Sequence, residues 1–462
     1  MIVVDTDVVS YFWLQMTADR PAARAARERD AHWAVFHLWR SEFRSVLRGY
    51  MTRDLMTLEE ASALIRRRRR TCTTASMGSL RTPFCSWSMT RGRIHRVDEE
   101  KPHRQPPPCE LATASCPEGK GQVHVFRSHT IFSSRMRAVR VPKEGDPEHM
   151  TIGEVSTPAP GPDEVRVAVH ATALNRADTF QRRGHYPPPE GASPILGLEM
   201  AGVVEEVGDG VIDWHEGDRV FSLLAGGGYA EQVVVHKDLL MAIPPGLSMQ
   251  EAAALPEVFL TAYQALHWLG GVQSSHTVLI HAGASGVGTA AIQLAADAGA
   301  IPYVTASAPK HDVCRRLGAE ATIDYESEDF ADRIGALTDG EGAHIIIDFI
   351  GAPYFHRNVA SLAMDGRVIQ LATLGGSTVE EVHLRDLMAK RAHLLTSTLR
   401  NRSLDYKIQL TQEFASDVLP KFVDEQLRPV IDSTYDWTEV ADAHRRMEHN
   451  ENAGKIVLQV IS

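Results

Sequence analysis

Between residues 136 and about 255 the chain alternates apolar and polar positions over short stretches. The run 163–170 places Val165, Val167 and Val169 two residues apart, which is the spacing of a half-buried strand. Further β-like runs, separated by glycine-rich turns, occur at 137–141, 200–207, 218–222 and 229–235. The pattern therefore predicts a mainly β domain over 136–255.

After Pro256 the pattern changes to short apolar strands that alternate with amphipathic helices. Strands are predicted at 277–280, 301–305, 345–349 and 367–371, and helices at 286–298 and 310–317. Alternation of strands and helices is typical of a doubly wound parallel sheet. The expected fold class is therefore α/β, with a β domain followed by a parallel-sheet domain over 256–399.

The first 135 residues have a different character. Over 1–65, a strand at 2–4 precedes helical patterning that places Trp39, Phe43 and Leu47 on one face. The segment 66–135 opens with five consecutive arginines and has no periodic apolar pattern. Such a segment buries too little apolar surface to offset the entropy of ordering, so we expect a basic, disordered linker.

Charge and cysteine content narrow the possible partners. The net charge is −11 overall, but it is +9 over 66–135 and −19 over 136–462, which argues against nucleic-acid binding by the larger region. No apolar stretch is long enough to cross a membrane, and no signal peptide is recognisable. Five cysteines do not make a disulfide framework in a chain of this length, so a cytoplasmic location is expected.

A glycine-rich turn joins the first predicted strand of the parallel sheet to its first helix. It contains Gly283, Ala284, Ser285, Gly286, Val287 and Gly288. Glycines let the backbone approach a pyrophosphate, and the helix N-terminus offers unpaired N–H groups to its negative charge. A tight structural turn is the alternative, but the position between a strand and a helix favours a dinucleotide site.

The end of the second predicted strand indicates which dinucleotide binds. Enzymes that use NAD place an acidic residue there to bind the ribose hydroxyls. Residues 305–310 contain no acid; instead Ser307 can donate a hydrogen bond and Lys310 a positive charge to a 2′-phosphate. NADP(H) is therefore the expected cofactor, although Lys310 could also be an ordinary solvated lysine.

Several motifs together resemble those of a known enzyme family. They are 173–178, 184–187, 255–257 with 260–263, 281–288 and 454–458, in the family's order and spacing. The region 136–462 thus resembles the zinc-independent NADPH:quinone oxidoreductases of the medium-chain dehydrogenase/reductase family. The resemblance implies a GroES-like β domain, to which residues of about 400–462 return, a Rossmann domain, an active-site cleft between them, and usually a homodimer.

The residues at two positions argue against a catalytic zinc. Where alcohol-dehydrogenase relatives place a zinc-binding cysteine and histidine, this chain has Asn175 and Leu198, and no cysteine occurs between 136 and 313. Without a metal to polarise a carbonyl, the hydride acceptor must already be electron-poor. A quinone meets this requirement, and an activated enone (2-alkenal) is the alternative acceptor.

The resemblance also implies roles for individual residues. Asn175 and Asp178 would line the cleft, although Asp178 could simply cap the following helix. Tyr186 would guard the acceptor pocket, as a proton donor or by stacking, and Thr261 would approach the nicotinamide. Ser307, Lys310 and Tyr325 would surround the adenosine phosphate, and Lys455 would close over the cofactor. The main chain that would follow the cofactor is at Phe349, Gly351, Leu374, Gly375, Gly376, Leu399 and Arg400.

The sequence leaves two functional classes open besides a reductase. Residues 1–65 resemble the opening of a PIN-type nuclease domain, in which Asp5 and Glu42 would help to hold a divalent metal for RNA cleavage. The resemblance ends near Arg66, which favours a remnant, and a frameshift that joined a partial gene to an enzyme starting at Met136 would explain it. A non-catalytic NADPH-binding protein is the other alternative.

Overall fold

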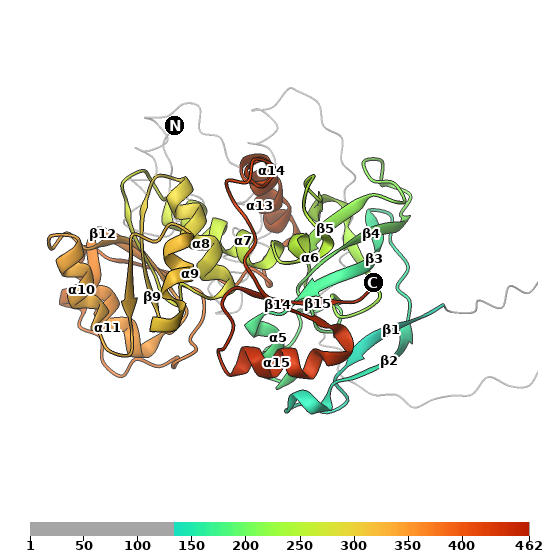
Figure 1. The fold of residues 1–462 in the computed structure, drawn as a ribbon, viewed down its shortest axis with the longest axis horizontal. Coiled ribbons are helices and arrows are strands. Elements are labelled where there is room, and N and C mark those ends of the chain that lie inside the picture. Colours follow the sequence, from blue (N-terminus) through green and yellow to red (C-terminus); the bar gives the residue numbers. More distant parts are fainter. Residues whose placement is uncertain (1–133, 462) are drawn as a thin grey trace, which may run out of the picture. The chain divides into compact units, whose positions relative to one another are not determined.

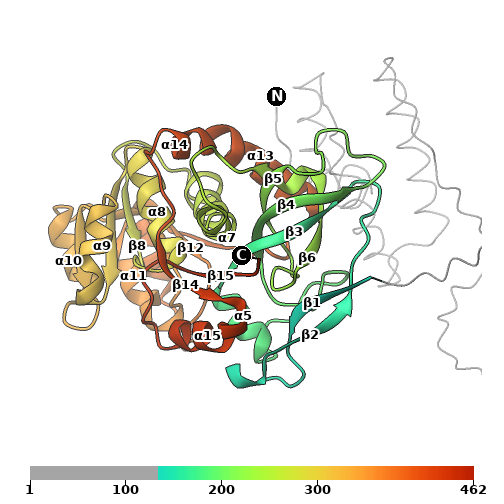
Figure 2. The same cartoon turned by 45° about the vertical axis from the view of Figure 1, so that its right-hand side comes forward.

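The computed structural model describes residues 134–461 of the 462-residue chain. The PIN-like fragment predicted for 1–65, and all but the last two residues of the linker predicted for 66–135, lie outside the described residues. In the described part, two sheets with different architectures are visible in Figures 1 and 2.

One sheet has six strands, all parallel, in the order β10-β9-β8-β11-β12-β13. Its strands are β8 (Thr277–Ile280), β9 (Ile301–Ala306), β10 (Ala321–Asp324), β11 (Ala343–Asp348), β12 (Leu362–Gln370) and β13 (His393–Thr396). The chain proceeds outward from β8 to β10 and then crosses back to β11. This is the Rossmann order, and its change of direction between β8 and β11 is where such sheets bind ligands.

Five helices connect or flank these strands. They are α8 (Gly286–Asp297), α9 (His311–Arg316), α10 (Phe330–Leu337), α11 (Phe355–Ser361) and α12 (Leu384–Lys390). The helices α8, α10 and α11 bury apolar side chains, whereas no residue of α12 is buried.

The other sheet is mainly antiparallel, in the order β14-β15-β3-β4-β5-β7, with β6 also paired to β3. Its strands are β3 (Glu164–Ala173), β4 (Glu199–Val207), β5 (Arg219–Leu223), β6 (Gln232–His236), β7 (Leu240–Ala242), β14 (Ile431–Asp436) and β15 (Lys455–Gln459). A separate hairpin consists of β1 (Arg135–Arg140) and β2 (Thr151–Ser156). The mainly antiparallel sheet forms a GroES-like domain, so the fold class expected from the sequence is confirmed.

The remaining helices pack around and between the two sheets. They are α5 (Arg176–Arg182), α6 (Met249–Ala253), α7 (Pro256–Tyr263), α13 (Leu404–Asp417), α14 (Leu419–Val423) and α15 (Val440–Glu448). Short 3-10 segments are Pro147–His149, Lys237–Leu239, Ala308–Lys310, Ala352–Tyr354 and Trp437–Glu439, and a π-helical segment, Gln264–Gly270, continues α7.

Helix α7 joins the two domains through a shared apolar core. Its Phe259 ring lies 5.0 Å from Phe422 and 6.4 Å from Phe414, measured between ring centroids. The same core includes Phe221 of β5 and Ile280 of β8, which belong to different sheets. Figures 1 and 2 show α7 between the Rossmann sheet and the β domain. Helix α7 therefore packs against both domains.

Candidate functional site

The residues predicted to bind the cofactor follow the carboxyl ends of successive Rossmann strands. The glycine-rich turn follows β8, Ser307 follows β9 and Tyr325 follows β10. Phe349 and Gly351 follow β11, Leu374–Gly376 follow β12, and Leu399 and Arg400 follow β13. Because the strands are parallel, all of these segments leave the same edge of the sheet. The structure thus gathers these residues at one edge, whereas Lys455 begins β15 of the other sheet.

The glycine-rich turn is shaped by contacts that exclude side chains. A Cβ atom at Gly283 would lie 2.6 Å from Cβ of Val304, and one at Gly288 would lie 2.6 Å from the carbonyl oxygen of Gly283. Ser285 caps the N-terminus of α8, because its hydroxyl accepts a hydrogen bond of 3.1 Å from Gly288 N. The first amides of a helix have no acceptor within it, and Ser285, Gly286 and Val287 are partly exposed. The turn therefore fits a pyrophosphate.

A buried polar network fixes the loop after β11. The Asp348 carboxylate accepts hydrogen bonds from the backbone N–H groups of Ile350 (2.5 Å) and Gly351 (3.2 Å) and from the Asn358 amide (2.8 Å). The Asn358 NH₂ group donates to Asp348. The side-chain oxygen of Asn358 therefore accepts a hydrogen bond of 2.7 Å from Nε2 of His281. Gly351, at φ +88°, forms a bridge with Gly376, which fixes the loops after β11 and β12 relative to each other.

Lys310 is held by the segment 450–454, which runs beside the glycine-rich turn. Its ammonium donates to the carbonyl oxygens of Asn450 (2.6 Å) and Asn452 (2.8 Å), and burial lowers its pKa. An ammonium has three N–H donors, so one remains for a phosphate oxygen. Arg176, which the sequence reasoning missed, donates to the Asn450 side chain at 2.6 Å. Ser307 precedes Lys310 and is partly exposed, and Tyr325 is 45% exposed.

A buried charged cluster lies where β4, β15 and α5 meet. The Lys455 ammonium donates to Glu199 Oε1 (2.7 Å), Asn175 Oδ1 (2.8 Å) and the carbonyl oxygen of Leu174 (2.7 Å). The Asn175 amide also donates to Glu199 Oε1, at 2.8 Å. All three N–H groups of Lys455 are used within the protein, and its side chain is 3% exposed. Lys455 thus holds Glu199, Asn175 and Leu174 together. The closing of Lys455 over the cofactor stays a prediction.

Asp178 is fully buried and turned toward the backbone. Its Oδ2 accepts a hydrogen bond of 2.8 Å from Asn175 N, and its Oδ1 accepts one of 3.0 Å from Gly197 N. Burial raises the pKa of Asp178 to about 6. The bond from Asn175 N is that of a capping box at the start of α5, the alternative role expected for Asp178, and it holds Asn175 beside Glu199.

Arg400 reaches from the Rossmann edge to the β domain. Its Nε donates to the carbonyl oxygen of Ala225 and its Nη2 to Gln181, both at 2.8 Å, and its Cζ lies 5.2 Å from the centroid of the Tyr186 ring. Its Nη1 is buried without a hydrogen-bond partner among the described residues. Burial raises the pKa of Tyr186. The two side chains therefore form a stacked pair that joins both domains.

Two glutamates near these residues were missed by the sequence reasoning. Glu199 accepts at Oε2 a hydrogen bond of 2.8 Å from the backbone N–H of Glu257, the second residue of α7. A signal was present in the sequence, because each acid interrupts an otherwise apolar stretch, 196–200 for Glu199 and 252–260 for Glu257. Thr261, one helical turn after Glu257, is partly exposed.

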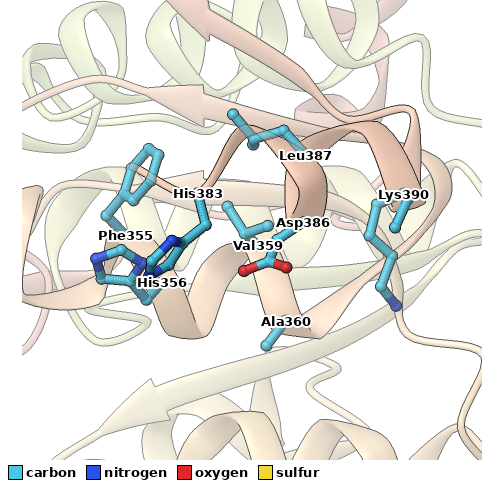
Figure 3. Close-up of a pocket in the computed structure, with 9 residues that line it drawn as sticks. Phe355, His356, Val359, Ala360, His383, Asp386, Leu387 and Lys390 are labelled. Atoms are coloured by element: carbon cyan, nitrogen blue, oxygen red, sulfur yellow. The ribbon is translucent and has the colours of Figure 1, made fainter. Parts of the chain in front are cut away.

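A pocket of about 270 Å³ lies elsewhere on the Rossmann domain, between α11 and α12 (Figure 3). It is lined by Phe355, His356, Val359, Ala360, His383, Asp386, Leu387, Ala389 and Lys390. None of the predicted site residues lines it. Within 134–461, no group of three or more His, Cys, Asp or Glu side chains is arranged to hold a metal, and no helix is long and apolar enough to span a membrane.

Comparison with family models divides the described region in the same way as the two sheets. A model described as "Alcohol dehydrogenase GroES-like domain" matches residues 161–245. A model described as "Zinc-binding dehydrogenase" matches residues 286–416. The first match covers most of the β domain, and the second contains the helix that follows the glycine-rich turn.

Individual proteins resemble the same region. The "Synaptic vesicle membrane protein VAT-1 homolog" of Rattus norvegicus is 34% identical over 320 residues, which are 65% of this chain and 78% of that protein. A Pseudomonas syringae quinone oxidoreductase structure is 31% identical, with a TM-score of 0.63, over 70% of this chain and 100% of that chain. The JamJ enoyl reductase structure is 26% identical, with a TM-score of 0.64, over 71% and 99% of the two chains.

Proposed function

Because this chain belongs to the medium-chain dehydrogenase/reductase family of oxidoreductases, we propose that it transfers hydride from NADPH to quinones without a metal. NADPH is proposed rather than NADH because the segment after β9 contains Ser307 and Lys310 and no acidic residue. Two N–H groups of the Lys310 ammonium donate to carbonyl oxygens within the protein, so the third can donate to a 2′-phosphate oxygen.

The proposed independence of metal is supported by the residues at the zinc-ligand positions. Asn175 is committed to Glu199 and Lys455, and Leu198 is 1% exposed and apolar. Neither is a zinc ligand, and a catalytic zinc needs about three protein ligands. When bound, the nicotinamide supplies the hydride, while the protein orients the acceptor and excludes water. An electron-poor acceptor such as a quinone suits this arrangement.

An activated enone is the second candidate acceptor. The likeness to an enoyl reductase, over almost the whole of that chain, supports it. Reduction of a quinone and of an enone requires the same position for the nicotinamide, so the two functions differ only in the shape of the acceptor pocket.

The decisive experiment is oxidation of NADPH by the full chain, followed by absorbance, with a para-quinone, an ortho-quinone or a 2-alkenal, and with NADH as the control. We expect fast quinone-dependent oxidation that prefers NADPH. Turnover with the alkenal alone would replace the quinone by the enone as the acceptor. Tight NADPH binding without turnover of any of these acceptors would contradict both proposals and favour a non-catalytic NADPH-binding protein.

Replacement of Lys310 by methionine tests the cofactor assignment. The variant loses a charge-assisted hydrogen bond, so the Kd for NADPH is expected to rise by about 10- to 100-fold. NADH has no 2′-phosphate, so its Kd should stay within about twofold and serves as the internal control. Titration of nicotinamide fluorescence measures both values. An equal weakening of NADPH and NADH would show that Lys310 acts only by holding the segment 450–454.

We also propose that the chain forms a homodimer through the β13 edge of the Rossmann sheet. In the described part, β13 pairs only with β12, and Leu394 of β13 is 46% exposed. An open, apolar strand edge favours pairing with a second copy. Light scattering should give twice the chain mass; Leu394→Lys should give a monomer, whereas Ile212→Lys, at a 78% exposed position of the β domain, should not. A monomeric wild-type chain would refute the proposal.

A further inference from the structure

We propose that Glu257 is the acid that protonates the acceptor oxygen after hydride transfer, an inference that rests on the proposed reductase function. Helix α7 buries every residue of Pro256–Tyr263 except Glu257 and Thr261, which are partly exposed. Residues four apart lie on the same face of a helix, so these two side chains share one face. The family resemblance implies that Thr261 approaches the nicotinamide, and Glu257 lies one helical turn from Thr261.

The backbone of Glu257 is fixed while its carboxyl group is left without a cation. Its N–H donates to Glu199 Oε2 at 2.8 Å, and Oε1 of the same carboxylate is already bonded to Lys455 and Asn175. Among the described residues, Glu257 forms no salt bridge, and its side-chain oxygens accept no hydrogen bond. A carboxyl group placed in this way can hold a proton and donate it.

The charged and titratable groups whose electric field acts on Glu257 come from several elements. They are Glu199 of β4, Lys455 of β15, Asp178 of α5, Arg400 after β13, Tyr186 after α5 and Lys407 of α13. Burial and the Glu199 carboxylate raise the pKa of Glu257 to about 8, against the opposing effect of Lys455 and Arg400. The carboxyl group is therefore largely protonated at pH 7. Burial also raises the pKa of Tyr186, which makes the tyrosine the weaker acid of the two.

The proposed step balances in atoms and charge. Hydride delivers two electrons and one hydrogen, which leaves a negative charge on an acceptor oxygen. The O–H bond of Glu257 breaks as a new O–H bond forms on that oxygen, so the reduced acceptor becomes neutral and Glu257 becomes a carboxylate. A proton from water then restores the acid. The positive charge of Arg400, stacked on Tyr186, lies near enough to Glu257 to stabilise its carboxylate form between turnovers.

The test compares Glu257→Gln with Glu216→Gln, a change at an exposed glutamate of the β domain. In the wild type, kcat is expected to fall as pH rises through about 8, because the deprotonated acid no longer donates. Glu257→Gln should lower kcat by about 100-fold and remove this limb of the pH profile, with the Kd for NADPH unchanged. Glu216→Gln should retain the wild-type kcat and profile.

A second readout does not depend on turnover. Infrared spectra of the chain without nucleotide should contain a protonated-carboxyl C=O band at pH 7 that is lost above pH 8 and is absent from Glu257→Gln. An active wild type without this band, or a Glu257→Gln variant with normal kcat and pH profile, would overturn the role of Glu257 alone. A wild type that shows the band but reduces neither quinones nor enones would overturn the proposed function, and the donor role with it.

Discussion

Replacement of Lys455 by methionine is expected to lower the free energy of unfolding by about 3–5 kcal/mol, the usual effect of removing one partner from a buried ion pair. The ammonium is the only cation bonded to the Glu199 carboxylate in the described part of the chain, and the side chains are 3% and 0% exposed. Methionine has a similar volume but no donor. It would leave Glu199, Asn175 Oδ1 and the carbonyl oxygen of Leu174 short of a hydrogen bond in a buried place.

The change should also weaken cofactor binding. The stem of Lys455 lies against the turn, since a Cβ atom at Gly286 would be 2.8 Å from Cδ of Lys455. Displacement of this side chain therefore reaches the N-terminus of α8, where the pyrophosphate is proposed to bind. We expect the Kd for NADPH to rise together with the loss of stability.

Urea unfolding measures the stability change, and two variants control it. Lys421→Met removes the partner of Asp297 from a pair whose side chains are 31% and 20% exposed, so it should cost less than about 1 kcal/mol. Adding Glu199→Gln to Lys455→Met removes the unpaired charge and should restore part of the lost stability. A Lys455→Met variant as stable as Lys421→Met would show that Glu199 is not an isolated buried carboxylate.

Local patterns in the sequence were sufficient to predict much of the fold. The strand predicted at 277–280 coincides with β8, and the helix predicted at 286–298 is one residue longer than α8. Both are short segments whose apolar positions are set by burial against the sheet. Strand β13 was not predicted, because its four residues, His393–Thr396, are mostly exposed at a sheet edge and carry no apolar alternation.

Local sequence patterns also could not predict which strands β14 and β15 pair with. A return of the C-terminal segment to the β domain was expected from the family resemblance, but the pairing of β15 with β3 joins residues almost 300 positions apart in the sequence. Hydrophobic periodicity reports which face of an element is buried, not which partner buries it. Only the folded chain identifies that partner.

The same distinction applies to the site. The glycine-rich turn is a local motif, and the sequence identified its residues and their placement after a strand. The cluster of Lys455 and Glu199 brings together residues 256 positions apart, and neither residue suggests the other from its neighbours. The sequence therefore indicated where a cofactor could bind but not how its surroundings were held, which is why Glu199 and Glu257 were overlooked.

Replacement of Gly288 by alanine is expected to have the second large effect. A Cβ atom there would clash with the carbonyl oxygen of Ala282 and lie 2.6 Å from that of Gly283, so two backbone carbonyls would have to move. Ala282 already adopts a left-handed conformation, at φ +49°, which leaves the turn little freedom to adjust. Overpacking of this kind costs about 1–3 kcal/mol, and displacement of the turn should raise the Kd for NADPH by at least about 100-fold.

Gly335→Ala is the matched control, because a Cβ atom at this position in α10 would meet nothing within 4 Å. In an uncrowded helix, alanine replaces glycine with a gain of about 0.5–1 kcal/mol, so this variant should be slightly more stable and bind NADPH normally. The two substitutions add the same methyl group to helices of the same domain. If both bound NADPH equally well, close approach of the backbone at Gly288 would not be what forms the pyrophosphate site, and the assignment of the turn would fail.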